Sequence, residues 1–173
     1  GVANTELSAI NNRDANPNDK AYLGSVAFTA PEDWGFLAGS TIYSGVVLGS
    51  VNTDTYYLGA TFNTPVADLR VGFAADYCET NNGNDVWILA TYASFQATEK
   101  LSLHGRVEYG ESEQGSNLFA GHDGILPFTA TAQYDLWENV ISRVELRWDE
   151  AKDVGGATAG NTVGAYANLI YKF

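Results

Sequence analysis

The chain has 173 residues, 45% of them hydrophobic and 13% aromatic, and its 21 acidic and 9 basic side chains give a formal net charge of −12. This length suits one domain. The acidic balance excludes a nucleic-acid-binding protein, because phosphate binding requires a basic surface. A spanning helix needs about 20 consecutive, mainly apolar residues, and the longest apolar runs, such as 86–90, are far shorter. If this chain crosses a membrane, it must therefore do so with strands.

Apolar and polar residues alternate with a period of two in many segments, a pattern typical of strands with two different faces. The N-terminal part is the weakest: 5–11 predicts a first strand or its remnant, and 21–30 and 35–46 are Gly-rich and ambiguous in facing. Clearer strands are predicted over 56–63, 69–78, 87–95, 101–109, 128–136, 140–149 and 163–173. The total is about ten strands of about ten residues, the length that a tilted membrane strand requires.

The segment 139–149 shows the two faces most clearly, because its even positions are mainly apolar and its odd positions mainly charged. A turn at 137–139 places Phe128 opposite Trp148, Ala132 opposite Val144 and Gln133 opposite Arg143. The apolar faces of the two strands then coincide, as a common register requires. A turn at 97–99 similarly predicts that Trp87 lies opposite Tyr109.

Short and long connections alternate along the chain. The short ones are 31–34, 63–68, 97–99 and 137–139, and the long ones are 11–20, 47–54, 79–85, 111–124 and 150–162. Outer-membrane barrels have short periplasmic turns and long outer loops, whereas a soluble Greek-key sandwich does not impose this rhythm. The pattern predicts an all-β fold, an antiparallel up-and-down transmembrane β-barrel, as a single domain over 1–173. A soluble secreted β-protein is the alternative.

Aromatic residues gather near the strand ends, at two levels. Two such levels around an apolar band are typical of the girdles that a barrel places at the lipid–water boundaries. The predicted membrane-girdle residues are Trp34, Phe95, Trp137, Tyr171 and Phe173 near the short turns, and Tyr77, Trp87, Tyr109 and Trp148 near the long loops.

The last segment, 165–173, has apolar residues at every second position back from Phe173. It resembles the C-terminal signal with which bacterial outer-membrane barrels engage their insertion machinery. The segments 136–149 and 103–109 also resemble hairpins of the OmpL-like beta-barrel porins. The resemblance implies a Gram-negative outer-membrane location and passive diffusion of small polar or ionic solutes. Members of that group are longer, so the chain is either the C-terminal part of a larger barrel or a small relative.

If the oily face meets lipid, the opposite face lines the lumen, because charges facing lipid at mid-depth cost about 2–4 kcal/mol each for Arg or Lys. We expect a charged constriction, since rings of charged side chains set ion preference. The alternative is that these charges pair and plug a narrow interior, giving a structural barrel that anchors or joins an envelope assembly. The predicted pore-lining residues are Arg70, Asp76, His104, Arg106, Glu108, Gln133, Arg143, Glu145, Arg147 and Asp149.

Enzymatic motifs are weak in this sequence. His104 near Glu108 could form an acid–base pair, but no serine elbow, phosphate-binding Gly-rich loop or paired metal-ligand motif is present. We therefore expect no enzyme activity, no catalytic residue, no metal and no cofactor. The expected partners are outer-membrane lipid and lipopolysaccharide, the barrel insertion machinery through the C-terminal strand, and either further copies of the chain or an envelope protein.

Overall fold

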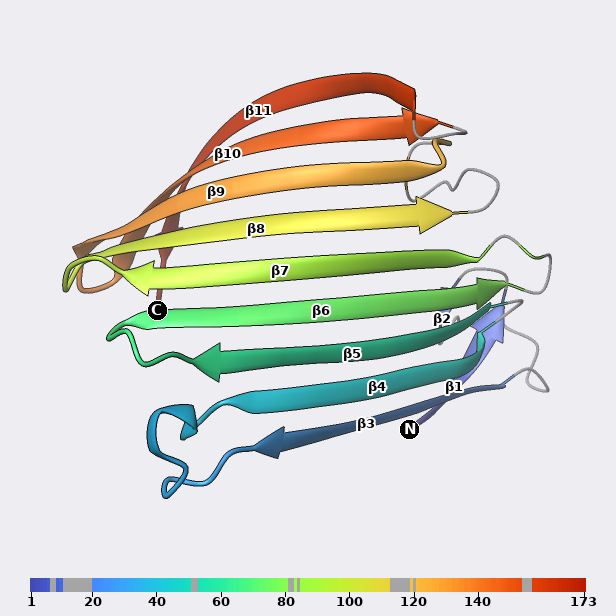
Figure 1. The fold of residues 1–173 in the computed structure, drawn as a ribbon, viewed down its shortest axis with the longest axis horizontal. Helices are drawn as coiled ribbons and strands as arrows, with labels where there is room; N and C mark the ends of the chain where they lie inside the picture. Colours follow the sequence, from blue (N-terminus) through green and yellow to red (C-terminus); the bar gives the residue numbers. More distant parts are fainter. Residues whose placement is uncertain are drawn as a thin grey trace.

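The computed structural model describes residues 1–6, 9–10, 20–50, 53–80, 83, 85–112, 119, 121–153 and 157–173. Within these residues, all strands join one antiparallel sheet of eleven strands. Ten of them, β1 and β3 to β11, follow one another as neighbours in chain order, and β2 is a two-residue strand beside β1. Figure 1 shows β3 to β11 side by side, with the short turns on the left. The predicted all-β, up-and-down architecture is therefore confirmed.

The strands β3 to β11, of 10 to 15 residues, are long enough to cross a bilayer when tilted. The strand bounds are β1 (Val2–Glu6), β2 (Ala9–Ile10), β3 (Lys20–Thr29), β4 (Thr41–Ser50), β5 (Thr53–Asn63), β6 (Leu69–Thr80), β7 (Val86–Gln96), β8 (Leu101–Ser112), β9 (Gly124–Trp137), β10 (Val140–Asp153) and β11 (Ala157–Tyr171). One short 3₁₀ helix, η1 (Gly35–Leu37), interrupts the link between β3 and β4. No helix in the described residues has the length and hydropathy needed to cross a membrane.

The register of the β9–β10 hairpin agrees with the prediction. Phe128 lies opposite Trp148, Ala132 opposite Val144 and Gln133 opposite Arg143. The β7–β8 hairpin differs by two residues, because Trp87 lies opposite Glu111 and Leu89 opposite Tyr109. The strand β8 begins at Leu101, as predicted, and the turn spans 97–100 rather than 97–99. The rings of Trp87 and Tyr109 still meet diagonally, with centroids 5.2 Å apart.

Two predicted outer loops are tighter than expected. The strands β4 and β5 reach residues 50 and 53, and Gly49 turns the chain with a φ of 74° while its N–H donates to Asp54 Oδ1 at 2.7 Å. The expected loop 150–162 is mostly strand, because Glu150 pairs with Asn161 and Asp149 with Thr162. The polar composition of both segments predicted loops. Strand pairing that continues beyond the membrane into water, however, does not require apolar side chains. Residues 11–19, and half of the predicted loop 111–124, lie outside the described residues.

The predicted strand 35–46 begins too early, since β4 starts only at Thr41. Residues 30–40 instead form a connection that is held against β5. The Asn63 side chain donates to the Ala38 carbonyl at 2.6 Å, and the Asn63 N–H donates to Ser40 Oγ at 3.0 Å. These two bonds fix the backbone of the connection without strand pairing, which alternation alone does not reveal.

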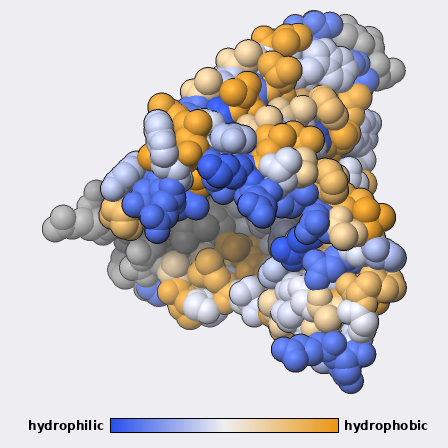
Figure 2. Space-filling view, turned by 90° about the vertical axis from the view of Figure 1, so that its left-hand side faces the viewer, coloured by the Kyte–Doolittle hydropathy of each residue, from blue (hydrophilic) through white to orange (hydrophobic). Residues whose placement is uncertain are grey.

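The sheet has two faces of opposite character. One face carries large apolar side chains that remain open to the surroundings, including Val144 and Leu146, which are 54% and 56% exposed. The other face carries charged side chains along its length, including Arg143, Glu145 and Arg147. Looking along the strands from the short-turn end, Figure 2 shows hydrophilic residues gathered around the central hollow and hydrophobic ones along the outer side. An apolar surface this continuous requires a non-aqueous neighbour, which lipid provides.

The sheet is open, with β1 and β2 at one edge and β11 at the other. The strands β3 and β11 run in the same direction (Figure 1), so an antiparallel barrel needs an odd number of strands between them on the closing side. The strand β1 has the required opposite direction and pairs Val2 with Tyr22 and Asn4 with Lys20. Beyond this contact, the Gly1 N–H and carbonyl bond to Leu23. The strand β1 thus occupies the closing position next to β3.

The β6–β7 link is anchored by Asp85. Its carboxylate accepts hydrogen bonds from the Tyr77 hydroxyl at 2.7 Å and from the Thr80 N–H at 2.9 Å. These two bonds, the Tyr77 bond first, lower the pKa of Asp85 below its usual value. The stabilisation from these two hydrogen bonds is therefore fully present above the pKa of an unfolded Asp, about 3.9. It is lost as the pH falls through the lowered pKa that Asp85 has in the folded protein.

We expect the ¹⁵N shift of the Thr80 amide to titrate with a midpoint below about 3.9, as measured by NMR in detergent. Asp85→Asn should remove this titration, because the amide cannot ionise. A midpoint above that of an ordinary aspartate would contradict the proposed anchor.

Candidate functional site

All ten predicted pore-lining residues lie on one face of the sheet. Strand pairing connects them in rows: Arg70 lies opposite Ser94, Ser94 opposite His104, His104 opposite Thr131, and Thr131 opposite Glu145. The neighbouring rows contain Gly72, Tyr92, Arg106, Thr129 and Arg147 on one side, and Ser102, Gln133, Arg143 and Asn168 on the other. Asp76, Glu108 and Asp149 follow further toward the long loops. The alternation therefore placed these side chains together correctly.

Four of these residues converge on one hollow. A cavity of about 270 Å³ is lined by His104, Arg106, Glu145 and Arg147, together with Tyr92, Thr129 and Thr131. Arg106 lies over the Tyr92 ring, with 5.8 Å from its Cζ to the ring centroid. The two arginine side chains are about half exposed, at 48% for Arg106 and 45% for Arg147. They are therefore available to a solute in this hollow.

The two arginines each pair with an acid on the same strand. Arg106 Nη2 donates to Glu108 Oε1, and Arg147 Nε donates to Asp149 Oδ1 at 2.8 Å. Each ion pair spans two residues of one strand, so both partners face the same side. Each guanidinium has five N–H donors, and one acid does not use them all. The wall therefore keeps hydrogen-bonding capacity toward the lumen.

His104 does not form the acid–base pair considered from the sequence. Its Nδ1 lies 3.0 Å from Ser94 Oγ and its Nε2 lies 3.1 Å from Ser102 Oγ. Glu108 is bonded to Arg106 instead. Both ring nitrogens of His104 are thus engaged by serines of the wall, an arrangement that fixes the ring rather than preparing it for proton transfer.

The wall nearer the short turns is held by neutral partners. Arg143 Nη2 donates to Gln133 Oε1 at 2.7 Å, and the Thr131 hydroxyl donates to Glu145 Oε2 at 3.2 Å. Arg143 Nε and Asp135 Oδ1 are buried and have no hydrogen-bond partner among the described residues. These two groups lie on adjacent strands. At this depth, the described side chains of the wall therefore do not satisfy all of their own hydrogen-bonding groups.

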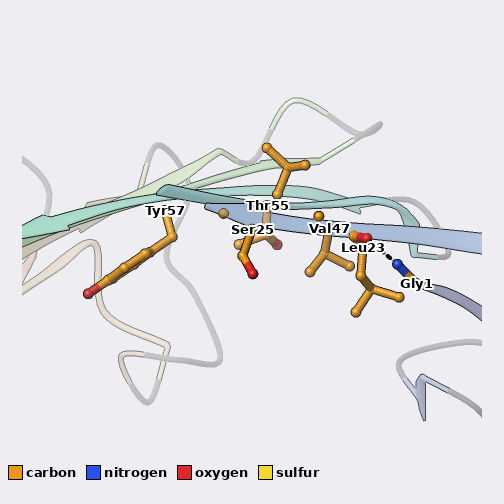
Figure 3. A pocket seen from close by; sticks show the side chains of 9 residues that line it. Gly1, Leu23, Ser25, Val47, Thr55 and Tyr57 are labelled. Atoms are coloured by element: carbon orange, nitrogen blue, oxygen red, sulfur yellow. Dashed lines mark hydrogen bonds between the residues drawn. The ribbon is translucent and has the colours of Figure 1, made fainter. Parts of the chain in front are cut away.

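The inner wall formed by β3, β4 and β5 differs from the charged wall. Its inward-facing residues are uncharged: Leu23, Ser25, Ala27 and Thr29 on β3, Thr41, Tyr43, Gly45 and Val47 on β4, and Thr55, Tyr57, Gly59, Thr61 and Asn63 on β5. A cavity of about 630 Å³ lies along this wall, lined by residues that include Leu23, Val47 and Tyr57. In Figure 3 these three side chains point to the same side of the sheet. The charges are therefore confined to one arc of the wall.

Sequence reasoning omitted three aromatic residues from the site. Tyr57 and Tyr92 share the inner face, and the Tyr57 ring lies across Gly59, where an added Cβ would come within 2.3 Å of the tyrosine hydroxyl. The alternation placed both tyrosines on this face, but only charged and amide residues were selected. Phe119, buried to 3% exposure, gave no sequence signal, because it lies in a link without periodicity.

The predicted girdle residues lie at the strand ends, on or next to the apolar face. Phe95 lies opposite Leu103, and Phe128 opposite Trp148. A register shift between Val140 and Ile141 places Trp137 opposite Val140, which in turn lies opposite Tyr171. The shift turns Trp137 to the apolar side, where simple alternation from Phe128 would place Leu136. Trp34 lies in the connection between β3 and β4, with its ring centroid 5.9 Å from that of Phe28.

In the part of the chain that the structure describes, no three His, Cys, Asp or Glu side chains come together to hold a metal ion. The site consists of a charged arc, an uncharged arc and hollows between strands. Its hydrogen bonds orient side chains along the wall and leave donors facing the hollow. This arrangement suits contact with passing solutes, as in channel walls.

The fold and the two-faced sheet define the class: a β-barrel protein of the outer membrane. The sequence profile of the family described as putative beta-barrel porin-2, OmpL-like, matches residues 3–173, and the chain belongs to this family. No curated protein matches the chain. A solved structure titled "NanC porin structure in rhombohedral crystal form" is similar in fold, with a TM-score of 0.52 and 11% identity over 89% of this chain and 93% of that chain.

Family membership places the chain in the bacterial outer membrane, in contact with lipid and lipopolysaccharide, as a porin for passive diffusion. The suggested resemblance to OmpL-like porins is thereby confirmed. The family and the fold are those of a channel rather than an enzyme.

Proposed function

We propose that the charged arc on β6, β8, β9 and β10 is the solute-selecting wall of this porin, and that small polar or ionic solutes pass along it. The supporting observation is that the ten predicted pore-lining residues share one face of the sheet, with Arg106 and Arg147 half exposed to the same hollow. Charged side chains around a water-filled pore set ion preference. The chain has no catalytic role in this proposal.

Single-channel conductance in a planar bilayer with a salt gradient tests this function. Discrete conductance steps with a non-zero reversal potential are expected, because the wall carries unevenly distributed charge. Silence from inserted protein that resists unfolding by heat would contradict the channel and favour a plugged structural barrel, in which the ion pairs fill the interior.

Replacing Arg106, Arg143 and Arg147 together with Gln should shift the permeability ratio toward cations. The acids Glu108, Glu145 and Asp149 then remain without nearby positive charge. One unit charge at 4 Å in water contributes about 1 kcal/mol, so we expect about a fivefold change for a passing ion. The reversal potential measures it, and Lys152→Gln on the same β10 serves as a cation-removing control. An unchanged ratio in the triple variant would refute the proposed wall.

We further propose that residues 1–173 form one barrel domain, closed between β11 and the strand that contains β1. Unpaired backbone groups are costly in lipid, and β1 has the direction that closure requires. The apolar alternation of β11 supports recognition by the insertion machinery, and further copies of the chain or an envelope protein could associate with the barrel. Loss of insertion on changing Leu169 and Tyr171 to Asn would support the recognition of β11.

A further inference from the structure

A three-residue pattern occurs three times on the charged wall: an arginine, an outward-facing residue and an acid. Its copies are Arg106 to Glu108 on β8, and Arg143 to Glu145 and Arg147 to Asp149 on β10. Both strands run from the short turns toward the long loops (Figure 1). In every copy, the arginine therefore lies nearer the short turns and the acid nearer the long loops.

Two of these pairs lie side by side. Arg106 is level with Thr129 on β9, and Thr129 is level with Arg147 on β10. Each arginine is bonded to its own acid two residues further along, Glu108 or Asp149. The lumen wall thus presents a row of two positive groups and, next to it on the long-loop side, a row of two negative groups.

Aligned charge pairs at the same level repel one another, because like charges then face like charges. Reversing one pair would bring each arginine level with an acid and relieve this repulsion. Local packing does not impose the aligned order, because both arginine side chains are about half exposed. The aligned order is thus an electrostatic property of the wall rather than a consequence of filling space.

The rest of the described wall does not cancel this polarity. The inward-facing residues of β3, β4 and β5 are uncharged. On β6, Arg70 lies nearer the short turns than Asp76, which gives the same sense. Asp135 and Glu145 are exceptions, since Asp135 lies beyond Arg143 on the short-turn side and Glu145 lies on the short-turn side of Arg147. The field along this part of the lumen therefore keeps one direction over the two rows.

We propose that this wall favours zwitterionic solutes, small molecules with an ammonium and a carboxylate group. The carboxylate would contact Arg106 and Arg147, and the ammonium would contact Glu108 and Asp149. An ion of either sign meets one row of like charge, and a nonionic solute gains nothing from either row. The inference rests on the channel function proposed above and narrows its solute class.

Swelling of proteoliposomes in isosmotic solute tests the inference, with glycine as the zwitterion and glycolamide as a nonionic solute with the same number of heavy atoms. The unchanged protein should admit glycine several times faster than glycolamide. Equal rates would leave the channel function intact and overturn this inference alone. Entry of neither solute, with inserted protein, would overturn both.

Charge-exchange variants provide the sharper test. Arg106→Glu combined with Glu108→Arg reverses one pair, so each row then contains one positive and one negative group. Glycine should then enter no faster than glycolamide. Exchanging Arg147 and Asp149 as well restores aligned rows of opposite sense, and a zwitterion that enters turned around should regain the preference. Retained preference in the first variant, or no recovery in the second, would overturn the inference.

A matched control exchanges Glu150 and Lys152, a pair bonded at 2.8 Å near the long-loop end of β10. It exchanges a basic and an acidic residue on β10 without changing the two rows, so the glycine preference should persist. Heat-modified migration on a gel confirms folding of each variant. A lost preference in this control would mean that the two rows are not responsible, which would overturn the inference.

Discussion

Leu146→Lys is expected to destabilise the barrel by about 2–4 kcal/mol, the cost of a cation on the lipid face near mid-depth. Leu146 is central on the apolar face of β10, between Ala130 of β9 and Ala165 of β11. No acid lies directly opposite it on either strand, and the neighbouring charged residues Glu145 and Arg147 point to the other face. Reversible denaturant unfolding in lipid vesicles measures the loss as a lower midpoint at constant slope.

Thr61→Lys is the matched control. Thr61 lies on the inner face of β5, opposite Thr41 and Gly72, where a new ammonium can reach water. We expect a change of about 0–1 kcal/mol there, by comparison with substitutions away from lipid. Equal losses at both positions would show that the apolar face is not the lipid face. That result would also remove the reason for placing the charged wall in the lumen.

The alternation of side chains could be predicted from the sequence, because lipid contact on one face imposes a period of two on the order of apolar and polar residues. For this reason the ten charged and amide residues fall on one face as predicted, and the β9–β10 register is correct. The β7–β8 register is wrong by two residues, because it depends on the turn geometry at Gln96 to Leu101. A shift of two residues keeps every side chain on the same face, so the alternation cannot reveal it.

The remaining differences have local causes. Trp137 faces the apolar side through the register shift after Val140, which simple alternation does not include. Strands that continue beyond the bilayer, as at Asn161, have loop-like composition yet keep their pairing. The side-by-side arrangement of Arg106 and Arg147 depends on pairing across β9, since neither residue is near the other in sequence. The faces of single strands and the register across the 137–139 turn were thus predictable from the sequence, whereas relations across more than one strand were not.

Phe119→Ala is expected to release the β8–β9 link from the outer part of the lumen wall. The Phe119 ring occupies the space above Gly110, where an added Cβ would come within 2.8 Å of its Cζ and 3.2 Å of Ile88 Cγ1. Gly110 and Ile88 are paired on the inner face. The N–H of His122 donates to the Phe119 carbonyl at 3.1 Å, and His122 Nδ1 lies 2.7 Å from Asp153 Oδ1. The ring is therefore the apolar anchor of a segment that also bonds to β10.

Burial of one such side chain contributes about 1.5–3 kcal/mol, so its removal should make the undocked link about 10- to 150-fold more populated. Hydrogen exchange of the His122 amide should quicken by a similar factor, and single-channel conductance should rise, since Phe119 borders a cavity shared with Arg147 and Asp149. Phe128→Ala is the control, because Phe128 lies on the apolar face and is 45% exposed. Faster exchange in that control, or an unchanged conductance in Phe119→Ala, would show that the ring does not narrow the outer mouth.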